Sequence, residues 1–265
     1  MKIAFIDYDI DNFHANVFAR LLKESDTSFH LSAVWAKRQD NLGPWAGERG
    51  VTAVERIEEL RDLADVIMVL APSNPEVHEE LCEQAFALGK TTYVDKTFAP
   101  DVATARRIFE CADRHQIAIQ TSSVLRYTEV QEACRAKPES PVRHLSTWAS
   151  GGNFDEYIIH PLEHVVSVMG AEIESVKSER MAGFQRITLG FSRDRAATIQ
   201  MYVGHGTPFF SVVSNDVETR PITIDGSKLF LRGLQGILDF FRNPATAIDR
   251  RETLAVLQTI ETLKG

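Results

Sequence analysis

Residues 2–12 read KIAFIDYDIDN, an apolar strand pattern followed by an acidic turn, and a helical pattern begins at Phe13. A strand–turn–helix unit of this kind is where nucleotide-binding α/β proteins carry a glycine-rich phosphate loop. Here Asp7, Asp9 and Asn12 stand at the three glycine positions. The order of elements therefore predicts a dinucleotide-type fold. The turn itself argues against the usual pyrophosphate contact, because carboxylates repel phosphates and side chains block the backbone amides.

The first half of the chain alternates between short apolar runs and helical patterns. Repeated β–α units of this length predict a parallel sheet with helices on both faces and right-handed connections. The expected strands lie at residues 2–6, 30–35, 66–71, 91–94 and 117–121, and the expected helices at 13–23, 54–61, 75–88 and 102–115.

After about residue 140 strand-like segments predominate, which predicts a second, mostly antiparallel sheet. We therefore expect an α/β protein with an N-terminal Rossmann-like parallel sheet (1–122) and a smaller C-terminal α+β domain for substrate binding and dimerisation (123–265). The expected strands are 143–150, 173–181, 185–191, 196–204 and 209–214, and the expected helices are 161–169, 231–242 and 251–264.

Composition excludes several classes of protein. The net charge of −8 and the lack of a basic stripe argue against a nucleic-acid partner. The three cysteines, Cys82, Cys111 and Cys134, lack metal or redox spacing, which is typical of a reducing compartment. Because no apolar run has the length of a membrane span and the first strand begins at residue 2, we expect no membrane association and no signal peptide. A cytoplasmic location is predicted.

Four short sequence motifs, called strings below, follow one another along the chain. Residues 71–78 read APSNPEVH, 89–97 read GKTTYVDKT, and 121–127 read TSSVLRY. A glycine pair at 151–152 is followed by Glu156, His160 and Glu163. Together these strings resemble the TPN-x-x-H, GK-hydrophobic-EKP, arginine–aromatic and GG…D-x-x-x-H-x-x-D segments of the Gfo/Idh/MocA family of nicotinamide-dependent oxidoreductases. The chain departs from that pattern at Asp95-Lys96-Thr97, which lacks the proline, and in having glutamate at both acid positions.

The resemblance implies an NAD(P)-dependent oxidoreductase that acts on a sugar- or polyol-like hydroxyl or carbonyl group. It implies a proton-transfer set of Lys96, His160 and Glu156. The residues expected to bind or orient the cofactor are Asp7, Asp9, Asn12, Lys37, Arg38, Pro72, Asn74, His78, Asp95 and Arg126.

Each of these assignments has a structural alternative. Lys96 follows a buried strand and is expected at the carboxyl edge of the sheet, where α/β proteins place their sites, but it could be an ordinary solvated lysine. Glu156 and His160 share one helical face, as acid and base groups require, but the histidine could simply precede the helix-initiating Pro161. The acids of the turn could cap the following helix, and we favour that interpretation for them.

The residues at the end of the second expected strand indicate which cofactor to expect. The acid that usually binds the adenosine ribose would fall near Ala36, and Lys37 and Arg38 follow instead. Two basic residues suit a 2′-phosphate, so NADP is favoured over NAD if a cofactor binds. A polar loop with ordinary charges is an equally good interpretation.

Two other functional classes stay open. A relative that has lost hydride transfer would be a small-molecule binding or regulatory protein, and the missing glycines favour it. Residues 160–164 read HPLEH and match H-x-x-E-H, an inverted zinc-peptidase pattern. The surrounding elements do not suit that class, so no metal site is expected.

The expected partners are a small, carbohydrate-like substrate and a second copy of the chain. Family precedent covers the open face of the second sheet by dimerisation. Ile199, Met201 and Val203 lie on one strand face and, with Phe209 and Phe210, could supply that surface. They could equally be core residues.

Overall fold

The computed structural model describes residues 1–25 and 28–264. The chain forms two compact units. The first contains Met1–Ser122 and Leu234–Ile248, and the second contains Ser123–Gly233 and the chain from Asp249 onward.

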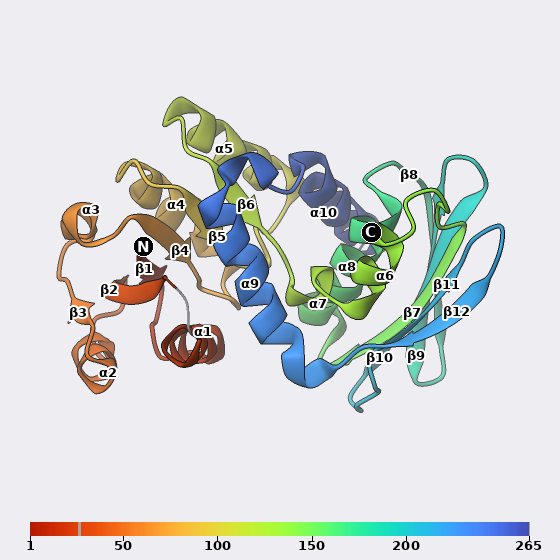
Figure 1. The fold of residues 1–265 in the computed structure, drawn as a ribbon, viewed down its shortest axis with the longest axis horizontal. Helices are drawn as coiled ribbons and strands as arrows, with labels where there is room; N and C mark the ends of the chain where they lie inside the picture. The colour runs from red at the N-terminus through yellow and green to blue at the C-terminus, as the bar shows by residue number, and fades with distance from the viewer. Residues whose placement is uncertain (26–27, 265) are drawn as a thin grey trace. The chain divides into compact units, whose positions relative to one another are not determined.

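The first unit is built on a parallel six-stranded sheet in the order β3-β2-β1-β4-β5-β6 (Figure 1). All four residues of β4 are buried, as expected for a parallel sheet that is covered on both faces. The strands are β1 (Lys2–Asp7), β2 (His30–Ala36), β3 (Thr52–Ala53), β4 (Val66–Val69), β5 (Thr92–Val94) and β6 (Ile119–Thr121).

Helices connect these strands. The first, α1, has a strongly apolar stripe that includes Phe18 and Leu22, and this stripe is buried. The α-helices are α1 (Phe13–Glu24), α2 (Leu42–Arg49), α3 (Leu60–Leu63), α4 (His78–Phe86) and α5 (Val102–Arg114), and the 3₁₀ turns are η1 (Ile57–Glu59) and η2 (Pro75–Val77).

The second unit contains a six-stranded sheet in the order β12-β11-β7-β10-β9-β8. Its pairs are antiparallel except for β7 with β10, so the predicted fold class is confirmed. The strands are β7 (His144–Gly151), β8 (Ile173–Met181), β9 (Phe184–Phe191), β10 (Arg195–Val203), β11 (Phe210–Ser214) and β12 (Thr219–Thr223). The helical elements are η3 (Val124–Arg126), α6 (Glu129–Arg135), α7 (Phe154–Tyr157), α8 (Ile159–Met169), η4 (Gly226–Lys228) and α10 (Arg250–Lys264). Helix α9 (Leu229–Arg242) begins in this unit and continues in the first unit, which also contains η5 (Pro244–Thr246).

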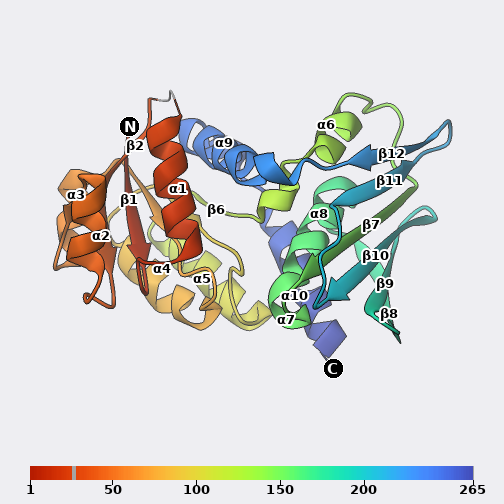
Figure 2. The ribbon, with the colours of Figure 1, turned by 90° about the horizontal axis from the view of Figure 1, so that it is seen from below.

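Helices α8 and α10 cover one face of this second sheet (Figure 2). Ile199 and Met201 are fully buried and therefore belong to the core, which settles the choice between core and interface against an interface role. Phe210 alternates onto the other face, where its ring stacks on Trp148 at a centroid distance of 4.7 Å. Because side chains alternate between the two faces of a strand, Phe210 does not share a surface with Ile199 and Met201, although the sequence grouped these residues.

The segment 234–248 lies in the first unit, although the sequence placed all of 123–265 in the second domain. Phe241, near the end of α9, is buried, and its ring lies 6.4 Å from that of Phe29. The Ile248 amide donates a hydrogen bond to the Gln120 side chain over 3.2 Å. Apolar burial and this bond attach the segment to the first unit.

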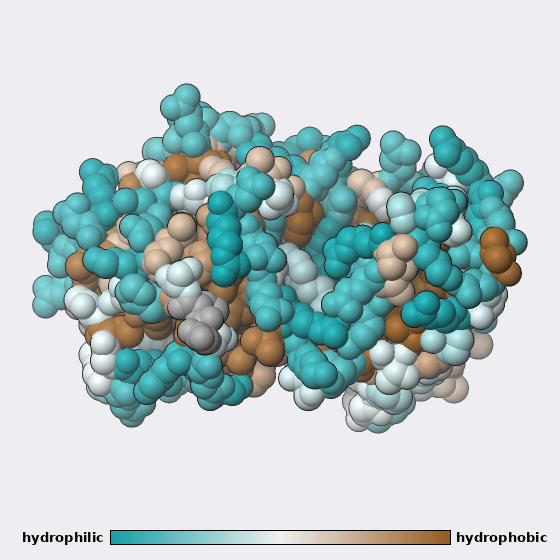
Figure 3. Space-filling view, in the orientation of Figure 1, coloured by the Kyte–Doolittle hydropathy of each residue, from teal (hydrophilic) through white to brown (hydrophobic). Residues whose placement is uncertain are grey.

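The exposed face in Figure 3 is mostly hydrophilic, with small, separated apolar patches. No described helix is both long and apolar enough to cross a membrane.

Candidate functional site

The candidate site of the first unit lies at the carboxyl edge of its sheet. Strand β1 has β2 on one side and β4 on the other, so the strand order reverses there. Open α/β sheets bind ligands outside the carboxyl ends of their strands at such a reversal. Asp7 ends β1, Ala71 and Pro72 follow β4, and Asp95 and Lys96 follow β5.

Asp7 is 1% exposed, and its carboxylate accepts several hydrogen bonds. The backbone amides of Tyr8 and Asp9 donate to Oδ1 over 2.7 and 3.3 Å, and the Ala71 amide donates to the same atom over 3.1 Å. The Asn12 side-chain amide donates to Oδ2 over 2.8 Å. This carboxylate therefore connects the first turn to the end of β4.

Burial raises the pKa of Asp7 from its usual 3.8 to about 7, although the hydrogen bonds from Asn12, Ala71, Tyr8 and Asp9 oppose the rise. A carboxyl group in this position changes its charge near neutral pH.

The other donors of the turn also bond within it. The Asp11 amide donates to the Asp9 side chain over 3.3 Å, and the Asn12 amide donates to the Ile10 carbonyl over 3.0 Å. Asn12 is the N-cap of α1, and its Oδ1 accepts from the Ala15 amide over 3.0 Å. The N-cap of α1 is therefore Asn12 and not one of the acids of the turn, and Asp7 serves as an internal acceptor.

A buried group of ionisable side chains adjoins the end of β5. His14, in the first turn of α1, places Nδ1 2.5 Å from Oδ2 of Asp95. Burial favours the neutral form of Asp95, yet the charge and hydrogen bond of His14, with Lys96 close by, hold its pKa below 3.8. His14 was not predicted as a site residue, because a histidine in an apolar helix stripe gives no local sign of a partner after β5.

Lys96 is 7% exposed and not a solvated surface lysine. Its Nζ donates to the Pro72 carbonyl over 3.1 Å, and its backbone amide donates to Asp95 over 2.9 Å. The Tyr93 hydroxyl donates to the Ser122 carbonyl over 2.9 Å and lies 3.4 Å from Asp95. The peptide bond between Lys96 and Thr97 is cis.

His78 was expected near a cofactor, and the structure gives it a buried position between two loops. Its Nε2 lies 2.7 Å from the Leu70 carbonyl, and its Nδ1 lies 3.1 Å from the Phe98 carbonyl. Burial lowers the pKa of His78, against the effect of both carbonyls. Asn74 precedes η2, and its side chain donates to Glu76 over 3.3 Å.

Lys37 and Arg38, the expected 2′-phosphate residues, follow β2 and are exposed. Lys37 Nζ lies 2.6 Å from Glu80, and Arg38 lies 3.4 Å from Asp9. Both cations thus face carboxylates, and in exposed pairs such contacts are weak.

In the second unit, His160 contacts Ser123. The Ser123 hydroxyl lies 2.7 Å from His160 Nδ1 and accepts from the Leu125 amide over 3.2 Å, which fixes the orientation of the imidazole ring. Glu156 is exposed, and its backbone amide donates to the Asn153 side chain over 2.8 Å. Glu156 thus belongs to the N-terminal capping group of α7.

Arg126 is buried and holds two carboxylates. Its guanidinium lies 2.7 Å from Glu163 on α8 and also contacts Glu252 on α10. Burial raises the pKa of Glu163, Arg126 opposes this, and Glu252 adds to it. The expected role of Arg126 in orienting a cofactor or substrate stays a prediction, and its described contacts are structural.

The H-x-x-E-H string does not form a metal site. His164 is buried, with Nε2 3.0 Å from the Ser211 hydroxyl and Nδ1 3.0 Å from the Gln131 side-chain amide. Glu163 is bonded to Arg126. Within residues 1–25 and 28–264, no group of three or more His, Cys, Asp or Glu side chains could hold a metal ion.

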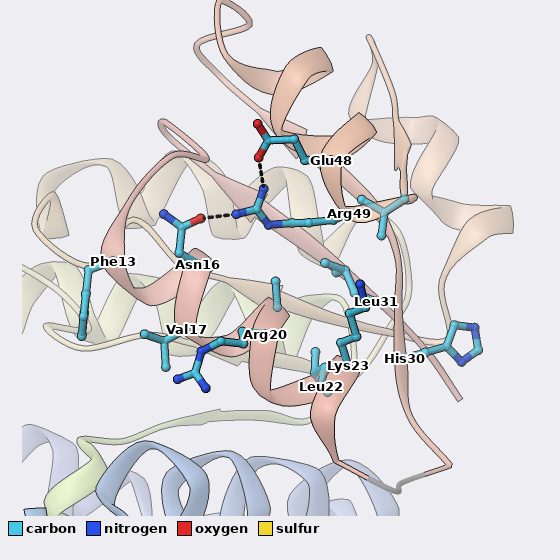
Figure 4. A pocket seen from close by; sticks show the side chains of 12 residues that line it. Phe13, Asn16, Val17, Arg20, Leu22, Lys23, His30, Leu31, Glu48 and Arg49 are labelled. Atoms are coloured by element: carbon cyan, nitrogen blue, oxygen red, sulfur yellow. Dashed lines mark hydrogen bonds and ion pairs between the residues drawn. The ribbon is translucent and has the colours of Figure 1, made fainter. Parts of the chain in front are cut away.

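A groove of about 700 Å³ lies elsewhere on the first unit (Figure 4). Phe13, Asn16 and Arg20 of α1 line it, opposite Leu31 near the start of β2 and Arg49 at the end of α2. Arg49 is held there by Asn16 over 2.8 Å. The groove therefore adjoins the amino end of β2 and is lined by none of the predicted site residues.

The fold and this edge of the sheet define a protein with a dinucleotide-type Rossmann domain and an attached α+β domain. Residues 9–123 match the model of the GFO_IDH_MocA family, described as an oxidoreductase family with an NAD-binding Rossmann fold. The match covers the first domain, and there it confirms the resemblance to the Gfo/Idh/MocA oxidoreductases seen in the sequence.

Solved structures share the fold over nearly the whole chain. A probable dehydrogenase from Thermotoga maritima has a TM-score of 0.82 at 16% identity, covering 98% of this chain and 94% of that one. UDP-N-acetylglucosamine 3-dehydrogenase from Acidithiobacillus ferrooxidans has a TM-score of 0.81 at 13% identity, covering 99% and 96%. Biliverdin reductase from Synechocystis, solved with biliverdin and NADP+, has a TM-score of 0.72 at 13% identity, covering 99% and 98%. The sequence matches no curated protein.

Because the family binds NAD(P), the Asp7–Asn12 turn would have to hold the pyrophosphate of that cofactor. The amides of Tyr8, Asp9, Asp11 and Asn12 donate within the turn. A pyrophosphate needs such donors, and it would meet the buried Asp7 carboxylate. The turn as it stands does not fit a dinucleotide pyrophosphate.

Proposed function

We propose that this protein is an NAD(P)-dependent oxidoreductase acting on a sugar- or polyol-like hydroxyl or carbonyl group. NADP is the first choice of cofactor, because Lys37 and Arg38 follow β2, and NAD is the alternative. The observation that carries the proposal is the buried Lys96, next to the His14–Asp95 pair at the carboxyl edge of β5.

In this proposal Lys96 Nζ exchanges a hydrogen bond or a proton with the substrate oxygen. Its place at the carboxyl edge of β5, with Nζ on the Pro72 carbonyl and the backbone amide on Asp95, supports this role. His160, oriented by Ser123, takes the other proton position, and Glu156 assists. The carbohydrate-like substrate is supported by the family strings and by relatives such as the UDP-N-acetylglucosamine 3-dehydrogenase.

The first test is equilibrium binding of NADPH and NADH, followed by turnover with a panel of keto sugars and polyols. We expect Lys96→Met to lower kcat by about 10²-fold or more and to change cofactor affinity by less than about threefold. Lys90→Met is the matched control, because Lys90 lies at the opposite end of β5. Absence of cofactor binding at millimolar concentration, or full activity of Lys96→Met, would refute the proposal.

The second candidate is a small-molecule binding or regulatory protein without hydride transfer. The occupied amides of the Asp7–Asn12 turn favour it. A crystal structure with an ordered dinucleotide along the carboxyl edge of the first sheet would exclude this candidate.

A further inference from the structure

We infer that the Asp7 carboxylate occupies the anion-binding position of the first turn and competes with a dinucleotide pyrophosphate for the same backbone amides. Asp7 thereby becomes the residue that sets nucleotide affinity. The inference deepens the proposed function, on which the choice of NAD(P)H as ligand rests.

The position of Asp7 supports this inference. Rossmann domains bind pyrophosphate at the turn between the first strand and the first helix, where glycines let phosphate oxygens reach the amides. Here one oxygen of Asp7 accepts from the amides of Tyr8, Asp9 and Ala71. These three donors come from both sides of the β1–β4 junction, where the strand order reverses. A carboxylate oxygen thus makes the contacts that a phosphate oxygen would make.

The Asp7 side chain is also fixed in place. The Asn12 side-chain amide bonds both its second oxygen and the Asp9 carbonyl, each over 2.8 Å. The side chain is 1% exposed, so it cannot swing into solvent without opening the turn. A pyrophosphate therefore has to displace a built-in ligand.

The other charged groups around the turn have partners of their own. Asp9 faces Arg38 at 3.4 Å, and Asp11 accepts from the Asn16 side chain over 3.0 Å. On α1, His14 bonds Asp95 beside Lys96, and after β2 Lys37 bonds Glu80. Asp7 is the buried carboxylate of the turn that has amides as partners, so its ionisation is the one that alters the anion-binding position.

Competition of this kind depends on pH. Because the pKa of Asp7 is about 7, the neutral form prevails at lower pH and the carboxylate at higher pH. A neutral carboxyl group attracts the amides less and does not repel phosphate. Nucleotide affinity is therefore expected to increase as the pH falls through neutrality.

The experiment is calorimetric titration of the full chain with NADH at about pH 6 and about pH 8. NADH is the better probe because it lacks the 2′-phosphate, a monoester that itself titrates near pH 6. We expect Asp7→Gly to bind at least about tenfold tighter than the wild type at the higher pH. The wild type should gain up to about tenfold between the two values, the ratio of neutral forms for a pKa near 7, and Asp7→Gly should not.

The matched control is Asp11→Gly, which removes an acid from the same turn outside the amide contacts. We expect it to change affinity by less than about threefold, as for a screened, exposed charge. If circular dichroism shows that Asp7→Gly is unfolded, Asp7→Asn is used in its place. We expect Asp7→Asn to bind NADH more tightly than the wild type at about pH 8, with an affinity that does not depend on pH.

Equal affinities of the wild type and the Asp7 variants, or no binding of NADH by a folded Asp7 variant at millimolar concentration, overturn the inference. Bound cofactor without turnover of any sugar or polyol would instead refute the proposed function and leave the inference about Asp7 standing. The two failures can therefore be distinguished.

Discussion

Asp7 and His164 are buried ionisable residues whose pKa values move in opposite directions. Burial raises the pKa of Asp7 to about 7 and lowers that of His164 to about 4. In both cases the neutral form is favoured, because the charged form loses its water. Each residue therefore ties the stability of the fold to pH.

For Asp7 we predict a loss of stability as the pH rises. Its folded pKa of about 7 lies above its usual 3.8, so the folded state binds more protons between these values and the free energy of unfolding decreases with rising pH. The full effect is roughly 4 kcal/mol. Asp7→Asn should remove it. Urea unfolding of both proteins at about pH 4.5 and pH 8 measures the difference, and an unchanged difference would contradict the prediction.

For His164 we predict a loss of stability at acidic pH. Its folded pKa of about 4 lies below 6.5, so its contribution to stability is complete above 6.5 and declines as the pH falls toward 4. The expected loss is roughly 3 kcal/mol. His164→Gln should flatten the acid limb of the stability curve, whereas His115→Gln, at an exposed position, should leave it unchanged. Thermal unfolding between about pH 4 and pH 7 provides the measurement.

At the scale of elements, the Arg126 side chain joins three helical segments. Arg126 on η3 bonds Glu163 on α8 and Glu252 on α10. Removing it leaves two carboxylates close together, one of them buried. A broken buried pair costs about 3–5 kcal/mol, because the remaining charge has lost both water and partner.

We therefore predict that Arg126→Met lowers the free energy of unfolding by about 3–5 kcal/mol. The matched control is Arg107→Met, which breaks the exposed pair of Arg107 with Glu79 and should lower the free energy of unfolding far less, because water screens an exposed pair. Denaturant unfolding of both variants tests this. Similar losses of unfolding free energy in the two variants would show that the buried Arg126 cluster stabilises the fold no more than an exposed ion pair does.

Secondary structure followed the sequence where periodicity was strong and departed from it where turns dominate. The residues of α2 were not predicted as helix, because Gly43, Pro44 and Gly47 are poor helix formers. In the structure Pro44 lies in the first turn, where it is tolerated, and Gly50 ends the helix with φ of +67°. The helix expected at 54–61 is instead η1 followed by α3, ending at Leu63.

At the scale of the whole molecule, we propose self-association through the outer face of the second sheet. Helices α8 and α10 cover the other face. On the outer face the stacked Trp148–Phe210 pair and the Phe184–Tyr202 pair, 5.2 Å apart, are partly buried and alternate with polar residues. Half-buried aromatic residues on an open sheet are typical of protein interfaces.

A lysine at the centre of this outer face should prevent self-association. Thr198 lies on β10 between Ser146 and Thr188 of the neighbouring strands. Light scattering after size exclusion should show a smaller species for Thr198→Lys than for the wild type. Thr262→Lys, on the exposed side of α10, should keep the wild-type mass. A monomeric wild type would rule out this interface.

The sequence by itself determined the order of the strongly periodic strands and helices, the two types of sheet and the family strings, because periodicity and short motifs are local properties of a chain. It also placed Lys96 at a strand end. It could not determine the partners of the site residues. Asp7 meets the Ala71 amide 64 residues away, His14 meets Asp95 at 81, and Arg126 meets Glu252 at 126. Such contacts depend on how elements pack, so only the tertiary structure decided that the acidic turn contains its own buried carboxyl group as the acceptor of its amides.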